Sequence, residues 1–265
     1  SLKGRVTDTS EGVGISVGAW FKIDDIQTTG VGQSILHSIQ YPGGWSLMWS
    51  NTRMQATMNY GDATRTDQLQ VQGAWRTLGN PAAGTELRAS GWHHSGFTFD
   101  GRYLKLYLNG GLLGTADAGS DDHYIHHRTP SDVGGATQPT CPHVNDADVL
   151  IGADPNALSS DGSGCGISGT SPGSTNMFEG LINEAAIWNK VLDVDAYDEI
   201  FEAVNTDGAV LDLTKNSGNY TNSGDLVALY RGNSIDGTTV TNVANPGTHD
   251  GSMKNSVGTS STVPS

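Results

Sequence analysis

The sequence is poor in cysteine, in basic residues and in long apolar runs. Its two cysteines are too few for a disulfide scaffold or for a zinc site built on cysteine ligands. No apolar run approaches the ~18 residues of a membrane-spanning helix, so membrane insertion is not expected. Lysine and arginine number 14 against 28 acidic residues, which gives a formal charge of −14. An acidic surface repels phosphate groups, which argues against nucleic acids and anionic membranes as partners.

Glycine and short alternating segments are abundant instead. The 265 residues include 36 glycines and 6 tryptophans. Apolar residues alternate with polar or smaller ones in 15–23, 45–49, 54–58 and 103–108, as in strands that pack one face inward. Between two such runs, the sequence Asn109-Gly110-Gly111 predicts a tight hairpin, because Asn and Gly accept positive φ. Many short strands between glycine-rich turns predict an all-β fold, a two-sheet antiparallel sandwich.

One short helix is expected late in the chain. Asp193 is suited to cap its start, and apolar residues follow at helical spacing from Val194 to Val204. Acidic residues occupy the opposite face, and Gly208 is placed to end the helix.

Two long loop-like segments, 116–148 and 155–176, flank a short strand at 149–151. Both are rich in Gly, Ser, Asp, Pro and His, and loops of this length are usually functional or disordered. Cys141 lies in the first loop and Cys165 in the second. A disulfide between them would tie the two loops across the strand, and the sequence leaves open whether it forms.

Four motifs follow one another along the chain, at 15–22, 91–110, 149–153 and 178–189. The second contains Trp-His-His, Asp-Gly and Asn-Gly, and the last reads FEGLINEAAIWN. In this order the motifs resemble strands of the laminin-G-like, concanavalin-type jelly rolls. The resemblance covers residues 1–205. It implies a jelly roll in which the two long loops are insertions.

Residues 206–265 follow as a C-terminal extension. Its segments 226–232, 236–243 and 249–253 are similar to the extension found after this jelly roll in virion proteins of tailed phages and in bacterial surface proteins. The extension has too few apolar residues for a core of its own. We therefore expect it to pack on the jelly roll or on a neighbouring subunit.

Ca²⁺ is the ion that the resemblance implies, and it requires six to eight oxygen ligands. Asn183 and Glu184 stand where the family has an Asp-Glu pair, so one of the usual charges is missing. An early segment of the family often supplies another carboxylate, which corresponds here to Asp8 beside basic residues. Asp154 is a poorer candidate. The sequence offers no other cofactor.

Sequence patterns of catalysis are missing. Glu179 and Glu184 are five residues apart on one strand, so they point to opposite faces and cannot act as the acid pair of a glycosidase. No Gly-x-Ser-x-Gly motif is present. His93 and His94 are adjacent in a strand and cannot both reach one site. These observations predict a protein that is not an enzyme.

Carbohydrate binding needs aromatic side chains on an exposed face. Trp45, Trp49 and Tyr60 have polar neighbours and could form such a platform. Two tryptophans four residues apart on a strand also fit a buried face, and the sequence leaves both interpretations open. Trp75 follows a polar stretch and is a further candidate.

Two functions are compatible with these features. The first is a non-enzymatic structural protein of a virion or cell surface, such as a capsid or tail decoration, a fibre or a filament component. It would act through self-assembly or contacts with other surface proteins, and the acidic charge, the phage-like extension and the loop insertions favour it. The alternative is a glycan-binding, lectin-type attachment domain. A glycoside hydrolase ranks third because no acid pair is found. Each would work outside the cell or on a virion.

Overall fold

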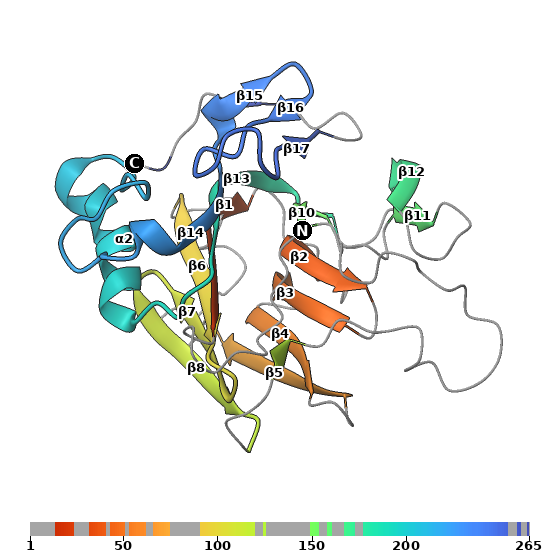
Figure 1. The fold of residues 1–265 in the computed structure, drawn as a ribbon, viewed down its shortest axis with the longest axis vertical. Helices are drawn as coiled ribbons and strands as arrows, with labels where there is room; N and C mark the ends of the chain where they lie inside the picture. Colours follow the sequence, from red (N-terminus) through yellow and green to blue (C-terminus); the bar gives the residue numbers. More distant parts are fainter. Residues whose placement is uncertain are drawn as a thin grey trace.

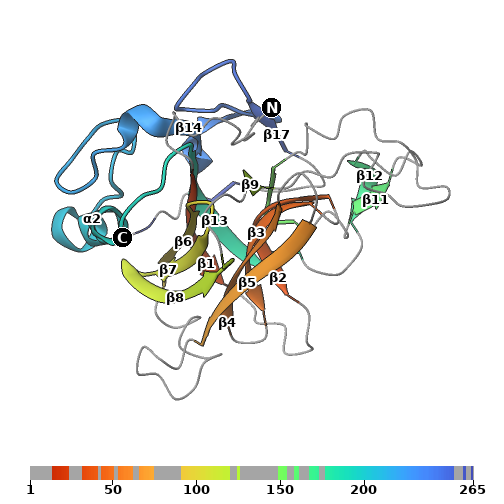
Figure 2. The same cartoon turned by 60° about the horizontal axis from the view of Figure 1, so that its bottom comes forward.

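Two antiparallel sheets face each other, and an α-helix packs on the outside of one of them (Figures 1 and 2). The computed structural model describes residues 14–23, 32–40, 43–50, 53–61, 66–74, 91–119, 124–125, 149–153, 158–160, 167–172, 177–253, 259–260 and 264. Within this part of the chain the predicted all-β, two-sheet antiparallel sandwich with one short helix is confirmed.

Sheet A has the strand order β14-β13-β1-β6-β7-β8. Its strands are β1 (Ile15–Ile23), β6 (His93–Phe99), β7 (Tyr103–Leu108), β8 (Gly111–Asp117), β13 (Gly180–Trp188) and β14 (Leu226–Tyr230). Sheet B has the order β10-β2-β3-β4-β5, and β9 pairs with β4. Its strands are β2 (Gln33–Gln40), β3 (Gly43–Ser50), β4 (Arg53–Gly61), β5 (Thr66–Ala74), β9 (Tyr124–Ile125) and β10 (Leu150–Ile151).

Smaller elements complete the described chain. A ribbon pairs β11 (Leu158–Ser160) with β12 (Ile167–Pro172). Near the C-terminus, β15 (Ile235–Asp236), β16 (Thr239–Val240) and β17 (Gly251–Ser252) form a three-stranded sheet. Two 3₁₀ turns, η4 (Ser223–Asp225) and η5 (Gly232–Ser234), flank β14. Within the described residues, no helix has the length and apolarity that crossing a bilayer requires.

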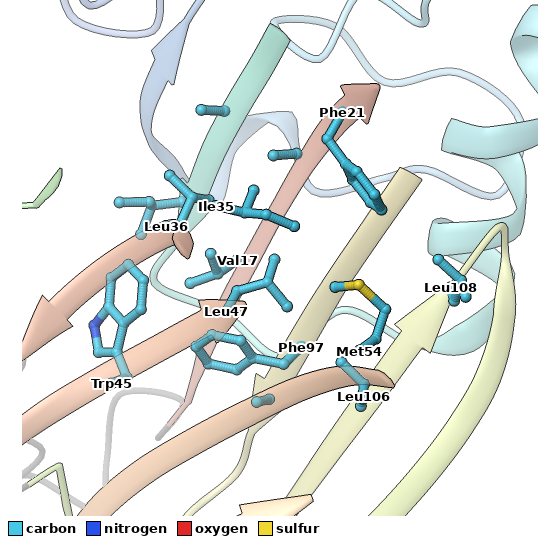
Figure 3. Close-up of a cluster of buried hydrophobic side chains, with 14 of the residues drawn as sticks. Val17, Phe21, Ile35, Leu36, Trp45, Leu47, Met54, Phe97, Leu106 and Leu108 are labelled. Atoms are coloured by element: carbon cyan, nitrogen blue, oxygen red, sulfur yellow. The ribbon is translucent and has the colours of Figure 1, made fainter. Parts of the chain in front are cut away.

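The main core lies between the two sheets, where the apolar faces of alternating strands meet (Figure 3). Val17 and Phe21 of β1 and Phe97 of β6 face Leu47 and Trp45 of β3, and each of these side chains is at most 2% exposed. The rings of Trp45 and Phe97 meet edge to face with centroids 5.6 Å apart. Burial of each large apolar side chain stabilises the fold by ~1.5–3 kcal/mol.

A second core lies between sheet A and helix α2 (Val194–Asp207). The predicted helix is confirmed at both ends: the Asp193 side chain accepts a hydrogen bond from Ala196 N at 2.8 Å, and Gly208 closes the helix with φ 66°. The Tyr197 hydroxyl lies 2.8 Å from the carbonyl oxygen of Val17 and 3.0 Å from that of Phe97. The helix is thereby hydrogen-bonded to the backbone of β1 and β6.

His93 and His94 point to opposite faces of sheet A, as predicted. His93 packs beside Phe21, with ring centroids 5.8 Å apart, whereas His94 lies on the helix side between Trp20 and Tyr197. Both histidines are buried: His93 lies on the side of the main core, and α2 covers His94 on the outer face of the sheet. Burial lowers the pKa of His94 to about 3, so this ring is neutral at physiological pH.

The hairpin predicted at Asn109-Gly110 joins β7 to β8. Leu108 pairs with Gly111, so the turn has two residues, and both have positive φ, 48° at Asn109 and 79° at Gly110. These angles suit the right-handed twist of the two strands. The Asn109 side chain also accepts from His94 N at 3.1 Å and lies 3.0 Å from Nδ1 of His93, which ties the turn to β6.

The C-terminal segment adds β14 to the edge of sheet A beside β13. The buried Asn242 then holds β14 from the other side. Its Oδ1 accepts from the backbone N–H groups of Leu229 (3.0 Å) and Ala244 (3.2 Å). Its Nδ2 donates to the carbonyl oxygens of Val227 (3.1 Å) and Thr248 (2.9 Å). All four hydrogen bonds of this amide are made within the protein.

Candidate functional site

The two tryptophans of the candidate platform are core residues. Trp45 and Trp49 are 2% and 1% exposed and belong to the cluster between the sheets. The exposed-platform interpretation is therefore wrong for this pair, because the large rings are buried against the opposite sheet rather than presented to solvent. Tyr60 lies in β4, but its side chain is outside the described part of the structure, as is Trp75 altogether.

The same strands carry a polar set of side chains on their other face. Cross-strand partners share a face, and the register pairs His37 with Ser46 and Ser46 with Thr57. A second row pairs Ser34 with Met48 and Met48 with Gln55. We call these six residues the polar face of sheet B: Ser34, His37, Ser46, Met48, Gln55 and Thr57. The backbone register continues both rows into β5, where Gln70 pairs with Thr57 and Gln72 with Gln55.

Hydrogen bonds connect the two rows of the polar face. Ser34 Oγ lies 3.2 Å from Nδ1 of His37, and Gln55 Nε2 donates to Thr57 Oγ1 at 3.2 Å. Gln55 Nε2 also lies 3.5 Å from the Met48 sulfur. Such contacts offset the cost of burying polar groups.

Exposure differs across the polar face. Ser34 is fully buried, His37 is 4% exposed and Gln55 is 8% exposed, while Met48 is only half-buried. Ser46 and Thr57 are 2% and 5% exposed, so solvent reaches this face mainly at Met48, on β3.

The polar face contains hydroxyl, amide and imidazole groups and no carboxylate. Arg53 stands at the start of β4, two residues before Gln55, and is exposed. The outer face of an antiparallel sheet is ordinarily polar and solvated, whereas five of these six side chains are at most 8% exposed. Rows of uncharged hydrogen-bond donors and acceptors can bind a ligand that presents many hydroxyl groups.

The predicted calcium residues occupy a bulge of β13. The pairing with β1 shifts between Gly18 and Trp20, and Glu184 has φ 49°. Both side chains contact the segment that follows β14: Asn183 Oδ1 accepts from Gly232 N at 3.0 Å, and the Glu184 carboxylate lies 2.9 Å from Nε of Arg231.

Arg231 therefore supplies the positive charge that meets Glu184. The side chain of Glu184 is 5% exposed and that of Arg231 is 20% exposed. Burial raises the pKa of Glu184, and the charge and hydrogen bond of Arg231 oppose that rise. Arg231 Nη2 also lies 3.4 Å from Oδ1 of Asp212, whose pKa is held well below its usual range, first by the Thr214 hydroxyl.

This geometry does not fit the expected Ca²⁺ site at Asn183 and Glu184. The guanidinium of Arg231 already pairs with the Glu184 carboxylate. A Ca²⁺ ion at this position would also lack most of its six to eight oxygen ligands. The described residues contain no group of three or more His, Cys, Asp or Glu side chains that could hold a metal ion. Asp8 and Asp154 lie outside the described residues, as do Cys141 and Cys165, the two candidates for a disulfide.

Sequence reasoning located β3 and β4 of the polar face, but its candidate binding residues lie on the other side of these strands. The available signal was the alternation itself, because Ser46 and Met48 interleave with the tryptophans of β3, and Gln55 and Thr57 interleave with the apolar residues of β4. The Arg231–Glu184 contact had no comparable signal, since the two residues are 47 positions apart.

Comparisons with known proteins were made for both sequence and structure. No family model and no curated protein matches the sequence. One similar solved structure is a protein of Bacteroides ovatus whose carbohydrate binding is itself only proposed, with 12% identity and TM-score 0.47. The match covers 87% of this chain and 49% of that one. Another is the botulinum neurotoxin serotype D ligand binding domain in complex with N-acetylneuraminic acid, with 16% identity and TM-score 0.44. It covers 72% of this chain and 36% of the toxin chain, so our chain spans half or less of either structure.

Proposed function

We propose that the chain is a laminin-G-like jelly roll that binds an uncharged glycan without cleaving it, at the surface of a cell or in the extracellular space. The observation that carries this proposal is the polar face of sheet B. It offers hydroxyl and amide groups in two rows, and none of its six side chains is a carboxylate. Glycan hydrolysis ordinarily needs two carboxylates across the scissile bond, so this face is suited to binding alone.

The chemistry of the face matches that of a sugar. A glycan presents hydroxyl groups that donate and accept, and Ser, Thr and Gln side chains do the same. Met48 adds a half-buried apolar surface for the C–H faces of a sugar ring. Because Met48 and Gln55 are the most accessible members, we expect the ligand to contact these two residues first.

The test is a glycan array followed by calorimetry on the best glycan. Thr57→Val keeps the shape of the side chain and removes its hydroxyl, and Gln55→Met removes the amide. One lost hydrogen bond is worth ~0.5–1.5 kcal/mol, which lowers affinity roughly two- to thirteen-fold.

The matched control is Thr239→Val, on the exposed strand β16 of the C-terminal sheet. It should leave the dissociation constant unchanged. Glycan binding that is equally strong in Thr57→Val, Gln55→Met and the wild type would refute the proposed site. An array without any bound glycan would refute the function.

A structural role on a virion or cell surface is the second candidate. It is favoured by one observation, the exposed edge of sheet A at β8, where Leu112 is 51% exposed. Such an edge can pair with another chain. The two functions are compatible, because attachment proteins can be both assembled and glycan-binding.

A further inference from the structure

The two edges of sheet A differ in how their backbone groups are satisfied. At β14, the C=O of Leu229 accepts from Val243 N at 2.8 Å, and its N–H donates to Asn242 Oδ1. The C=O of Val227 accepts from Asn242 Nδ2. The segment around Asn242 thus closes this edge to further strands.

The opposite edge is β8, which has no strand paired beyond it in the described part of the chain (Figures 1 and 2). Ala118 N donates to the carbonyl oxygen of Arg102 at 2.9 Å, so residue 118 faces β7. Alternation along an antiparallel ladder then turns the N–H and C=O groups of Thr115 and Asp117 away from β7. Both residues are exposed, although β5 of the other sheet approaches β8 at this corner.

The composition of β8 lacks the usual protection of an open edge. Natural edges carry lysine, proline or inward-pointing charges that prevent pairing with other chains. Residues 111–116 contain no charged residue and no proline. Leu112 is the most exposed large apolar side chain among the described residues, at 51%. The one edge-protecting feature of β8 is a β-bulge, seen as a register shift opposite Leu106 and Tyr107.

Asp117, the one charged residue of the strand, is already neutralised within the chain. Nε of Arg102 lies 2.9 Å from Oδ1 of Asp117, and Nη2 donates to Oδ2 at 3.2 Å. Gly119 N also donates to Oδ1 at 2.7 Å. The edge is therefore close to neutral in a protein whose formal charge is −14.

We propose that β8 pairs antiparallel with β8 of a second copy of this chain, about a two-fold axis. Two identical strands in antiparallel pairing are complementary to each other, so no other partner is required. Two strongly acidic molecules approach with least repulsion at a neutral edge. The two Asp117 residues lie at opposite ends of the paired strands in this arrangement.

The closed edge at β14 limits the assembly. Each copy has one open and one closed edge in sheet A, so pairing through β8 joins two six-stranded sheets and then stops. The product is a closed dimer rather than a fibre. This inference does not depend on glycan binding.

The experiment is sedimentation velocity across a concentration series of the full chain. The wild type should sediment at twice the chain mass of 27.8 kDa in the micromolar range. Thr115→Lys places a charge on the edge and should give monomer, with a dimer dissociation constant at least ten-fold higher than that of the wild type. Thr115→Pro removes an outward N–H without removing a hydrogen bond to β7, and it should also give monomer. Thr239→Lys, an equal change on exposed β16, should remain dimeric.

Amide hydrogen exchange locates the interface. The amide groups of Thr115 and Asp117 should be protected at high concentration and exchange freely in Thr115→Lys. A wild type that is monomeric at every concentration overturns the proposal. So does a dimer that persists in both Thr115 variants, or one in which these two amides exchange freely, because the contact then lies on another surface.

Discussion

Replacing Arg231 by methionine tests whether its pairing with Glu184 holds the C-terminal segment on the sandwich. The substitution keeps a long side chain but removes the charge, leaving a carboxylate whose side chain is 5% exposed without its nearest cation. Breaking a buried pair in this way costs ~3–5 kcal/mol. The 20% exposure of Arg231 admits some screening by water, so we expect about 3 kcal/mol of unfolding free energy to be lost.

The cost of Arg231→Met should depend on pH in a defined direction. Burial already raises the pKa of Glu184, and loss of the guanidinium raises it further. An acid whose folded pKa lies above its unfolded value contributes stability at low pH, and that stability is lost as pH rises through the folded pKa. The variant should therefore lose more stability relative to the wild type at pH 8 than at pH 4.5.

The assay is urea unfolding followed by tryptophan fluorescence at the two pH values. Arg102→Met is the matched control, because Nε of Arg102 also lies 2.9 Å from a carboxylate, that of Asp117, but the two side chains are 31% and 45% exposed. That change should cost far less than Arg231→Met, because water screens an exposed pair. Equal losses in the two variants, or a loss at Arg231 that is independent of pH, would refute the reasoning.

Three further outcomes can be measured by the same unfolding assay. Gly96→Ala should destabilise the fold by ~3 kcal/mol or more, because the added methyl would overlap the Tyr197 ring of α2 and the carbonyl oxygen of Val17 in β1. In the control Gly224→Ala, the added methyl meets no atom within 4 Å, so the stability should not change. Asn242→Asp should lose ~2–4 kcal/mol because the two buried bonds donated by its amide disappear, and exposed Asn233→Asp should lose almost nothing. The pKa of His94 is about 3 in the folded protein and 6.5 in the unfolded chain, so the unfolded state takes up the proton first as pH falls. The free energy of unfolding should therefore fall by up to ~1.4 kcal/mol per pH unit below pH 6. His94→Phe should remove this contribution to the pH dependence.

Local signals account for the elements that the sequence predicted well. The ends of α2 were predictable because Asp193 and Gly208 act through contacts within a few residues. The hairpin at Asn109-Gly110 was predictable because only its own backbone angles matter. Period-two alternation likewise located β1, β3, β4 and β7.

Long-range packing decided what the sequence could not. Alternation divides β3 into two faces, but it does not say which face meets the other sheet, so Trp45 and Trp49 stayed ambiguous until their burial was seen. The alternation in β1 predicts a solvent-exposed outer face, yet α2 covers that face. Glu184 was predicted as a metal ligand from the resemblance, and its contact with Arg231, 47 positions away, has no local signal that would have corrected this prediction.

The fold leaves separate places for binding and for assembly, and this separation can be tested. Helix α2 and the C-terminal segment pack on the outer face of sheet A, whereas the polar face lies on sheet B and the open edge is β8. If a dimer presents two polar faces, binding to a glycan-coated surface gains from effective concentration, by as much as ~10²–10⁴-fold. Thr115→Lys should then keep the per-site dissociation constant measured by calorimetry with a soluble glycan, and lose at least ten-fold in apparent affinity for the coated surface. A variant whose per-site affinity falls as far as its surface affinity would show that the edge belongs to the glycan site itself, and the separation of the two surfaces would be wrong.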